Sequence, residues 1–512
     1  MNFPLLTYLT LAPLFGGIVV LLVGSNDRVA RKFALAFSFV PLALVVLAWR
    51  NFDMASSALQ FAERHAWIPS LGAEYMLGID GLGLVMILLA AVVVPFAAIA
   101  TTHVNNAKLY YALMLFLQSG LFGTFTALNF FHWFIFWELS LVPAFFLLKL
   151  WGGPKRTGAA LQFFIYTFVG SVAMLLAFVG LFIATGTFDF ATLAQKAQSG
   201  ELLRSVGATF TGFPLATSTW MTLLFLGVFL GFAVKVPLIP FHTWLPLAYT
   251  EAPTTTSMVL TGVMSKMGVY GFIRILMPIF PTQMQAALTP LLWLAVATIV
   301  FSAYAAFAQR DLKRIVAYSS INHLGYCLLG LFAVLKSSDA SLLNERAAAL
   351  NGVVLQMFNH GITASALFCF VGFLEHRNHG ARSIDDFGGM RKVAPVLCGL
   401  MGITVFSSLG LPGLNGFVGE FLIFKGTFSL TAWAAAISTL GLLATAIFLL
   451  TMIQKVFTGP VKRNQAWVDL TTTERMTVAP MIAAMFVLGI APNLLLQVIN
   501  PTVTAMLAAV KF

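Results

Sequence analysis

The sequence predicts an all-α polytopic membrane protein with about fourteen transmembrane helices, two of them broken. Of its 512 residues, 59% are hydrophobic and only 9% are charged, and the mean hydropathy is +0.91. A soluble domain has about a quarter of its residues charged. Long apolar runs recur along the whole chain with short polar segments between them. Most of the surface must therefore face lipid.

The expected spans are apolar runs of about 20 residues, the length of helix that crosses ~30 Å of hydrocarbon. The first of them lacks a basic flank and a cleavage motif, so we expect it to stay in the mature protein. The boundaries between neighbouring spans near 128–130 and near 247–252 are the least clearly marked in the sequence. The fourteen runs are 5–24, 32–49, 81–101, 110–128, 129–150, 159–186, 219–247, 252–277, 286–308, 313–336, 347–374, 394–425, 432–458 and 477–500.

The net charge of +11 reports membrane topology rather than a nucleic-acid partner. When the loops are counted alternately, one set carries about twice as many of the 29 Lys and Arg residues as the other. Loops rich in Lys and Arg stay in the cytoplasm, so both termini are expected on the outer, periplasmic side. The length and the lack of an Arg- and Ser-rich transit segment suit a bacterial cytoplasmic membrane, although an organelle-encoded protein would look similar.

No cofactor is expected in this chain. The longest loops, near 51–80, 187–218 and 375–393, are too short to hold a core of their own. No G-x-G-x-x-G or Walker A pattern follows a strand, which excludes a nucleotide site. Cys327, Cys369 and Cys398 have no C-x-x-C spacing, so they predict neither a metal centre nor an iron–sulfur cluster.

Two segments rich in proline and glycine interrupt apolar spans. The seventh span contains Pro237 and Pro240, and the twelfth contains Pro412 and Gly413. Proline removes a helix hydrogen bond, and inside a membrane the freed backbone is tolerated where it faces protein or a water-filled cavity. The breaks therefore predict a transporter or channel, with lipid-facing kinks of no function as the alternative.

The two breaks lie five helices apart and predict an internal repeat. Because five is odd, helices 4–8 and 9–13 would run in opposite directions, and interrupted helices at matching places of inverted halves mark transport sites. We expect helices 1–3 over residues 1–109, the first repeat over 110–277, the second over 286–458, and a C-terminal helix over 459–512.

Four ionisable residues lie well inside apolar runs: Glu138, Lys235, Lys266 and Glu420. A charge at the bilayer centre costs at least ~2.5–3.5 kcal/mol, and residues that tolerate this cost normally mark ion or proton pathways. They are therefore expected to face the bundle interior. An ion pair at ~4 Å is worth ~4 kcal/mol at an effective dielectric of about 20, so we expect Glu138 to pair with Lys235. Lys266 would receive the proton and Glu420 would pass it on; static ion pairs that only fix packing are the alternative.

Histidines could join these sites, because imidazole titrates near neutrality. His323 and His360 lie in helices ten and eleven, between the two breaks. They would act either as proton relays or as hydrogen-bonded structural groups. His242 follows the first break and could serve proton uptake. Glu251 either caps the next helix or shapes the same uptake path. The charged run at 310–314 is expected to anchor topology through local ion pairs.

Five segments between residues ~125 and 425 together resemble the antiporter-like subunits of respiratory complex I. They are FHWFIFWELSLVPAFFLL, GGPKRTGAALQFFIYTFVGS, FAVKVPLIPFHTWLPLAYTEAPTTTSMVLTGVMSKMGVYG, RDLKRIVAYSSINHLGY and LGLPGLNGFVGEF. The resemblance implies the fourteen-helix fold and proton translocation driven by quinone reduction in other subunits. It places the essential glutamate of the family on Glu138, its broken-helix lysine on Lys235 and its connecting lysine on Lys266. His323 and Glu420 match the groups on helices ten and twelve, and His360 is a looser match.

The subunit M type is favoured by the glutamate at position 420, where subunits L and N and Mrp-type antiporters usually have lysine. The end of the chain, close to the last expected span, favours it too, because subunit L continues into a long lateral helix. The resemblance implies partners among the L and N type subunits, with NADH, FMN, iron–sulfur clusters and quinone bound elsewhere in the complex. An Mrp-type sodium/proton antiporter subunit and a membrane subunit of a hydrogenase-type complex are the alternatives.

Overall fold

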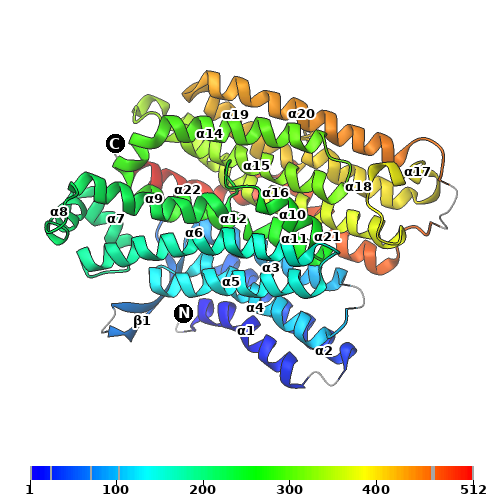
Figure 1. Ribbon diagram of the computed structural model, residues 1–512, viewed down its shortest axis with the longest axis horizontal. Helices are drawn as coiled ribbons and strands as arrows, with labels where there is room; N and C mark the ends of the chain where they lie inside the picture. Colours follow the sequence, from blue (N-terminus) through cyan, green and yellow to red (C-terminus); the bar gives the residue numbers. More distant parts are fainter. Residues whose placement is uncertain (1–2, 24–25, 70–71, 102–103, 463–466, 510–512) are drawn as a thin grey trace.

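The computed structural model describes residues 3–23, 26–69, 72–101, 104–462 and 467–509. Within these ranges, 13 helices are long and apolar enough to cross a membrane. Most of them run side by side along the long axis of the molecule (Figure 1). The expectation of an all-α polytopic membrane protein is confirmed. The expected span 394–425 is not among these 13 helices, because the predicted break divides it into two shorter ones, Pro395–Ser408 and Asn415–Leu430.

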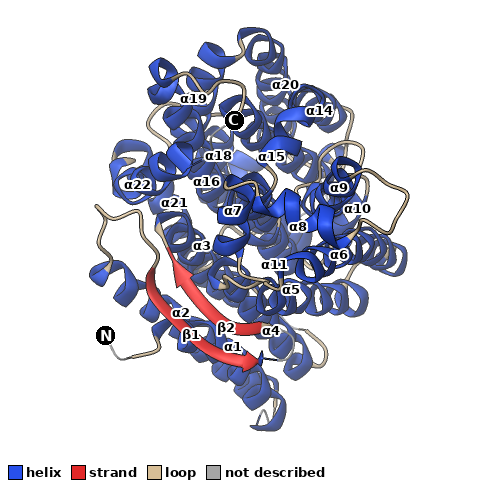
Figure 2. Cartoon of the chain, turned by 90° about the vertical axis from the view of Figure 1, so that its left-hand side faces the viewer, coloured by secondary structure: helices blue, strands red, loops and turns tan. Residues whose placement is uncertain are grey.

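The N-terminal region contains a two-stranded antiparallel hairpin where only a loop was expected (Figure 2). Tyr75 in the second strand packs against His132, with ring centroids 4.5 Å apart and the planes tilted by 42°. Glu63 in the first strand accepts the backbone N–H of Leu6 at 2.8 Å, so the hairpin holds the start of the first helix. The elements are α1 (Leu5–Val23), α2 (Asp27–Asn51), β1 (Gln60–Ile68), β2 (Ala73–Ile79) and α3 (Gly81–Ala100).

The first predicted break is confirmed. The expected span 219–247 is helical only to Lys235, and a new helix begins at Trp244, beyond Pro237 and Pro240. The expected loop 187–218 contains two short helices. The elements of this region are α4 (Ala107–Thr126), α5 (Phe130–Trp151), α6 (Arg156–Thr185), α7 (Phe190–Gln198), α8 (Glu201–Thr209), α9 (Thr217–Lys235), α10 (Trp244–Glu251), α11 (Thr254–Val259), the π-helix η2 (Leu260–Met264), α12 (Lys266–Gly271), the π-helix η3 (Phe272–Leu276) and α13 (Met277–Ile279).

The second break is confirmed as well, between Ser408 and Asn415, with Pro412 and Gly413 inside it. Gly413 has a φ of +93°, which L side chains rarely adopt. The remaining elements are α14 (Pro281–Phe307), α15 (Leu312–Val334), η4 (Ala340–Leu342), α16 (Leu343–Arg377), η5 (Ile384–Asp386), α17 (Met390–Val393), α18 (Pro395–Ser408), α19 (Asn415–Leu430), α20 (Ala432–Phe457), α21 (Thr472–Ile490) and α22 (Asn493–Ala509).

The single last span expected over 477–500 is wrong. Helix α21 ends at Ile490 and α22 begins at Asn493, with Pro492 between them. Proline restricts the residue before it to extended backbone, so a helix usually ends there. The inverted relation of the two repeats and their domain limits stay predictions.

Three segments form the enclosed centre of the bundle. In the apolar windows of 254–279, of α15 and of 340–377, 94% of the residues are buried. Helix α16 packs against α15, α19, α22 and α3. By contrast, only 28–39% of the windows of α1, α2, α6 and α20 is buried. Lys266, His323 and His360 therefore belong to the segments farthest from lipid.

Asp469 holds the beginning of α18 and gives a pH-dependent prediction. Its carboxylate accepts the backbone N–H groups of Val396 and Leu397, each at 2.9 Å. Burial raises the pKa of Asp469, but backbone N–H groups, including that of Leu470, outweigh it and leave the pKa below its usual value. A lowered folded-state pKa contributes stability above about pH 4 that is lost as the pH falls through the folded pKa. Asp469→Asn should therefore lower the thermal unfolding midpoint near pH 7 and reduce its loss on acidification, measured by melting the detergent-solubilised complex; an unchanged acid dependence would contradict this.

Candidate functional site

Lys266 and His360 are in direct contact at the centre of the bundle. Lys266 begins α12, directly after the π-helix η2 and Ser265, and its Nζ lies 2.8 Å from Nδ1 of His360 on α16. The ammonium also donates to the Thr261 carbonyl and lies 3.4 Å from Ser265 Oγ. Both side chains are buried. An amine and an imidazole at this distance can exchange a proton.

His323 on α15 continues the contact toward Glu420. Its ring stacks on that of His360, with centroids 5.1 Å apart and planes at 22°. Its Nε2 lies 3.3 Å from Glu420 Oε1 on α19, and its Nδ1 lies 2.7 Å from the Ser319 carbonyl. A small cavity borders both rings and Glu420. The predicted residues Lys266, His360, His323 and Glu420 therefore form one continuous polar chain.

The second helix break shapes the end of this chain. Asn415 donates its amide to the Asn359 carbonyl at 3.3 Å, and Asn359 donates to the Asn415 carbonyl at 2.7 Å. Ser407 Oγ donates to Asn415 Oδ1 at 2.6 Å. Nε2 of His323 lies 3.1 Å from the Ser408 carbonyl, which the break leaves at the end of α18. The freed backbone thus faces the polar chain, as irregular backbone inside a membrane requires.

The expected direct pair of Glu138 and Lys235 is not formed. Lys235 Nζ and Glu138 Oε1, both among the described atoms, have no hydrogen-bond partner, although the two charges are close enough to interact. The ammonium instead lies 4.8 Å from the ring centroid of Trp137, a cation–π arrangement. Neighbours on a helix do not face the same way, so the indole occupies the place expected for the carboxylate. Glu138 is only partly buried, whereas Lys235 is buried.

Among the described residues, neither of the two predicted uptake residues forms a hydrogen bond or ion pair with the Lys266 chain. His242 is half-buried in the segment between α9 and α10, with Nδ1 unpartnered among the described atoms. Glu251 accepts the backbone N–H of Lys155 at 2.8 Å and, through its carbonyl, that of Gly153 at 2.7 Å. Its carboxylate therefore holds the beginning of α6 and not that of the next helix, because the turn at Pro253 gives α11 no side-chain cap.

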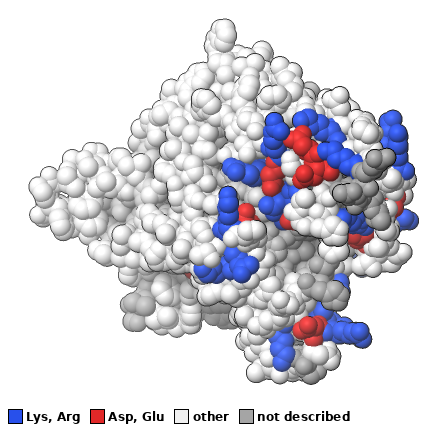
Figure 3. All heavy atoms as spheres, turned by 45° about the vertical axis from the view of Figure 1, so that its right-hand side comes forward, with Lys and Arg blue, Asp and Glu red and all other residues white. Residues whose placement is uncertain are grey.

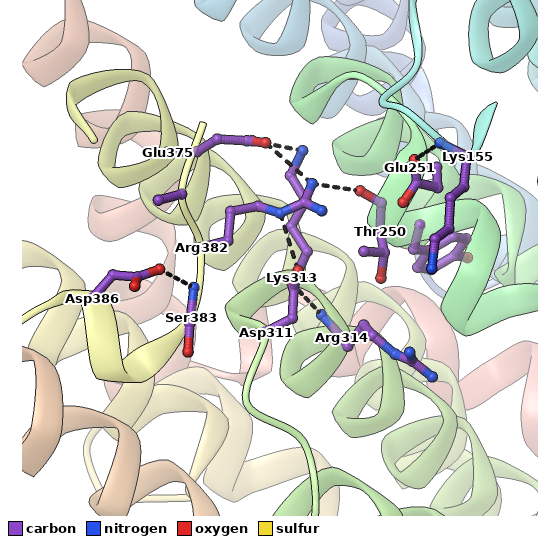
Figure 4. A network of polar contacts seen from close by, with 12 residues as sticks. Lys155, Thr250, Glu251, Asp311, Lys313, Arg314, Glu375, Arg382, Ser383 and Asp386 are labelled. Atoms are coloured by element: carbon purple, nitrogen blue, oxygen red, sulfur yellow. Dashed lines mark hydrogen bonds and ion pairs between the residues drawn. The ribbon is translucent and has the colours of Figure 1, made fainter. Parts of the chain in front are cut away.

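The charged run at 310–314 does more than pair locally. Figure 3 shows Lys, Arg, Asp and Glu gathered at one end of the molecule, beside a large surface that is free of them. Lys313 Nζ lies 2.8 Å from Glu375 Oε2, and Arg382 contacts both Glu375 and Asp311 at 3.1 Å (Figure 4). Arg310 pairs with an exposed carboxylate of η5 at 2.7 Å. The expected anchor is thus a network that ties α15 to α16.

Comparison with known proteins places this architecture in a family. A family model described as NADH:quinone oxidoreductase/Mrp antiporter, TM, matches residues 127–448. NADH-quinone oxidoreductase subunit M of Rhodobacter capsulatus is 36% identical, over 98% of this chain and 95% of that protein. The chain belongs to the subunit M family. The resemblance expected from its five sequence segments is confirmed.

Other subunit M relatives match over a similar extent. The protein of Rickettsia typhi is 33% identical over 100% of both chains, and that of Mycobacterium tuberculosis H37Rv is 33% identical over 98% of this chain and 94% of its own. Respiratory complex I from Thermus thermophilus with bound NADH contains a chain with a TM-score of 0.84 and 27% identity, covering 99% of this chain and 100% of that one. Chains of an archaeal membrane-bound sulfane sulfur reductase and of the Mrp complex from Dietzia sp. DQ12-45-1b, at 21% and 18% identity, share the fold with TM-scores of 0.83 and 0.82.

Several residues of this subunit M family chain escaped the sequence analysis. Trp137 could have been noticed, because an aromatic residue beside a membrane glutamate is a ready partner for a buried cation. The Asn359–Asn415 pair and the contact of Lys313 with Glu375 join distant parts of the chain. No spacing within one segment reports such contacts.

Proposed function

We propose that this chain is a proton-translocating membrane-arm subunit of an NADH:quinone oxidoreductase. The chain Lys266–His360–His323–Glu420 carries the proposal, because it leads from the π-helix η2 to the second helix break through groups that each gain and lose a proton. The redox chemistry, with NADH, FMN, iron–sulfur clusters and quinone, would belong to other subunits. In response to that redox chemistry, protons would cross the membrane through this chain.

The geometry supports a sequence of transfers through this chain. Protonated Lys266 gives a proton to Nδ1 of His360 at 2.8 Å. His360 releases a proton from its other nitrogen toward the cavity that it shares with His323. His323 then passes one proton to Glu420 through Nε2. The cycle closes when Glu420 loses its proton, Lys266 is protonated again and the His360 ring rotates, because His360 is left with its proton on Nδ1 and must present its unprotonated nitrogen to Lys266 before the next transfer.

The sibling antiporter-like subunits L and N are the proposed neighbours. Glu138 lies in an apolar span and is only partly buried in the isolated chain, and an ionisable residue within the membrane is costly when it faces lipid. A neighbouring subunit would cover it. We also propose the bacterial cytoplasmic membrane as the location, with the charged end of Figure 3 on the cytoplasmic side and both termini outside.

Lys266→Ala in the assembled complex tests the proposed function. NADH-driven proton pumping into membrane vesicles should fall to background, because the truncated side chain holds no proton. Lys336→Ala serves as the control, because Lys336 is exposed and its ammonium donates to the Thr289 hydroxyl at 3.1 Å. An assembled Lys266→Ala complex that pumps at the control rate would refute the function.

The same vesicles separate this function from the Mrp-type alternative. Pumping should collapse with a protonophore and should persist in sodium-free buffer. A requirement for sodium rather than for quinone turnover would instead favour an antiporter subunit. Purification of the chain with hydrogenase rather than NADH-oxidising subunits would favour the third possibility.

A further inference from the structure

Glu375 stands at the border between a cavity and the buried network of Figure 4. The cavity has a volume of about 470 Å³, and Tyr110, Thr254, Thr255 and His376 also line it. The side chain of Glu375 is 23% exposed, whereas that of Lys313, 2.8 Å away, is 3% exposed. The carboxylate therefore meets the cavity on one side and a buried ammonium on the other.

The two cations on Glu375 differ in what they can do. Arg382 is fixed by Asp311 at 3.1 Å and by the Thr250 carbonyl at 2.9 Å, and a guanidinium does not release its proton in proteins. Lys313 is a compact ammonium whose proton affinity changes readily when it is buried. Lys313 is thus the member of this network suited to transfer a proton inward.

A buried polar path leads from Lys313 to Lys266. Lys313 Nζ donates to the Ala252 carbonyl at 3.3 Å, and Ser257 Oγ lies 3.4 Å from the same oxygen. Ser257 Oγ also lies 2.8 Å from the backbone carbonyl of Tyr249. At the far end of the same residue, beyond the ring, the Tyr249 hydroxyl donates to the Leu260 carbonyl at 3.0 Å, so water must bridge the stretch between Ser257 and this hydroxyl.

The far end of this path reaches the proton chain. The Leu260 carbonyl that accepts from Tyr249 also accepts the backbone N–H of Ser265 at 3.1 Å, and Ser265 Oγ is 3.4 Å from Lys266 Nζ. Ser257, Tyr249 and Ser265 are all buried. Hydroxyls and carbonyls spaced in this way offer buried water the two to four polar partners that it needs.

We propose that Glu375 takes up protons from the cavity and that Lys313 delivers them to Lys266. A proton from cavity water binds the Glu375 carboxylate, which leaves Lys313 without its counter-ion. The Lys313 ammonium releases its proton along the hydroxyl-lined path to the Lys266 amine. Neutral Lys313 then takes the proton from Glu375, and the ion pair re-forms. One proton has moved inward, and both groups are unchanged.

This inference rests on the proposed function, and Lys313→Arg in the assembled complex tests it. Arginine keeps the positive charge and the pairing with Glu375 but does not give up a proton. If Lys313 only ties α15 to α16, the variant should pump as well as the unaltered complex. Proton relay predicts that pumping falls by about tenfold or more. Lys455→Arg, at an exposed pair of 3.3 Å with Asp385, is the matched control and should pump normally.

Glu375→Gln is the second variant, in case arginine does not fit at position 313. The amide keeps the shape and still accepts from Lys313, but it does not carry a proton, so the same loss is expected. Glu474→Gln is its control, because Glu474 lines the same cavity and pairs with Arg377 instead. Normal pumping in either assembled variant, Lys313→Arg or Glu375→Gln, overturns the inference. If Lys266→Ala is impaired at the same time, the proposed function stands and only this uptake route fails.

Discussion

Lys235→Met is expected to abolish NADH-driven proton pumping while leaving the complex as stable as before, or more so. The Lys235 ammonium is buried with no hydrogen-bond partner among the described atoms and lies 4.8 Å from the ring centroid of Trp137. A structural cation normally has hydrogen-bond partners or a direct ion pair, and the cation–π contact with Trp137 satisfies none of the three ammonium donors, so we expect a functional reason for the burial of this charge. Methionine has a similar length and removes a cost of about 2.5–3.5 kcal/mol for a charge at the bilayer centre.

Two measurements on one preparation check this prediction. The initial rate of proton pumping in vesicles should fall to background, and the thermal unfolding midpoint should stay or rise. Lys32→Met on the outer helix α2 provides the control, because Lys32 is exposed. Glu138→Ala should also lose most of the pumping. Normal pumping by the assembled Lys235→Met complex would show that the buried lysine takes no part.

Asp80→Ala is expected to destabilise the chain by about 3–5 kcal/mol, the usual cost of leaving one partner of a buried pair uncompensated. Asp80 lies 2.5 Å from Arg274 Nη2, and their side chains are 4% and 15% exposed. The same carboxylate caps α3 by accepting the Gly83 N–H at 3.1 Å. Loss of this carboxylate therefore removes the cap of α3 and leaves the Arg274 guanidinium without its counter-ion.

The yield of assembled complex and its unfolding midpoint measure this effect. Asp80→Ala combined with Arg274→Met should recover part of the lost stability, because no charge is then left unpaired. A single Asp80→Ala variant with unchanged yield and midpoint would contradict the assignment. So would a double variant that is less stable than the single one.

Much of the fold was readable from the sequence, because each helix is determined by its own apolar run. Pro237 and Pro412 also located the breaks, since proline acts on the turn that contains it. The hairpin before α3 was missed, because a short strand pair in a polar segment resembles a loop. The turn at Pro492 was missed because the apolar character continues on both sides of it.

The candidate site was predictable in its members but not in all of its contacts. Lys266, His323, His360 and Glu420 stood out as ionisable groups in apolar runs, and they do meet. The expected contact of Glu138 with Lys235 failed, because rotation about a helix axis decides which neighbour faces the partner and hydropathy does not report that rotation. Glu375 lay at the polar end of a span, where a carboxylate looks merely solvated.

The stacking of His323 on His360 limits the number of protons that the proposed relay can hold at once. Two imidazolium cations with centroids 5.1 Å apart would repel each other by ~3 kcal/mol at an effective dielectric of about 20. Double occupancy would thus be rarer by roughly a hundredfold. In the proposed relay, the two rings would therefore hold one proton at a time, and faster turnover of the complex would require each proton to leave the pair sooner.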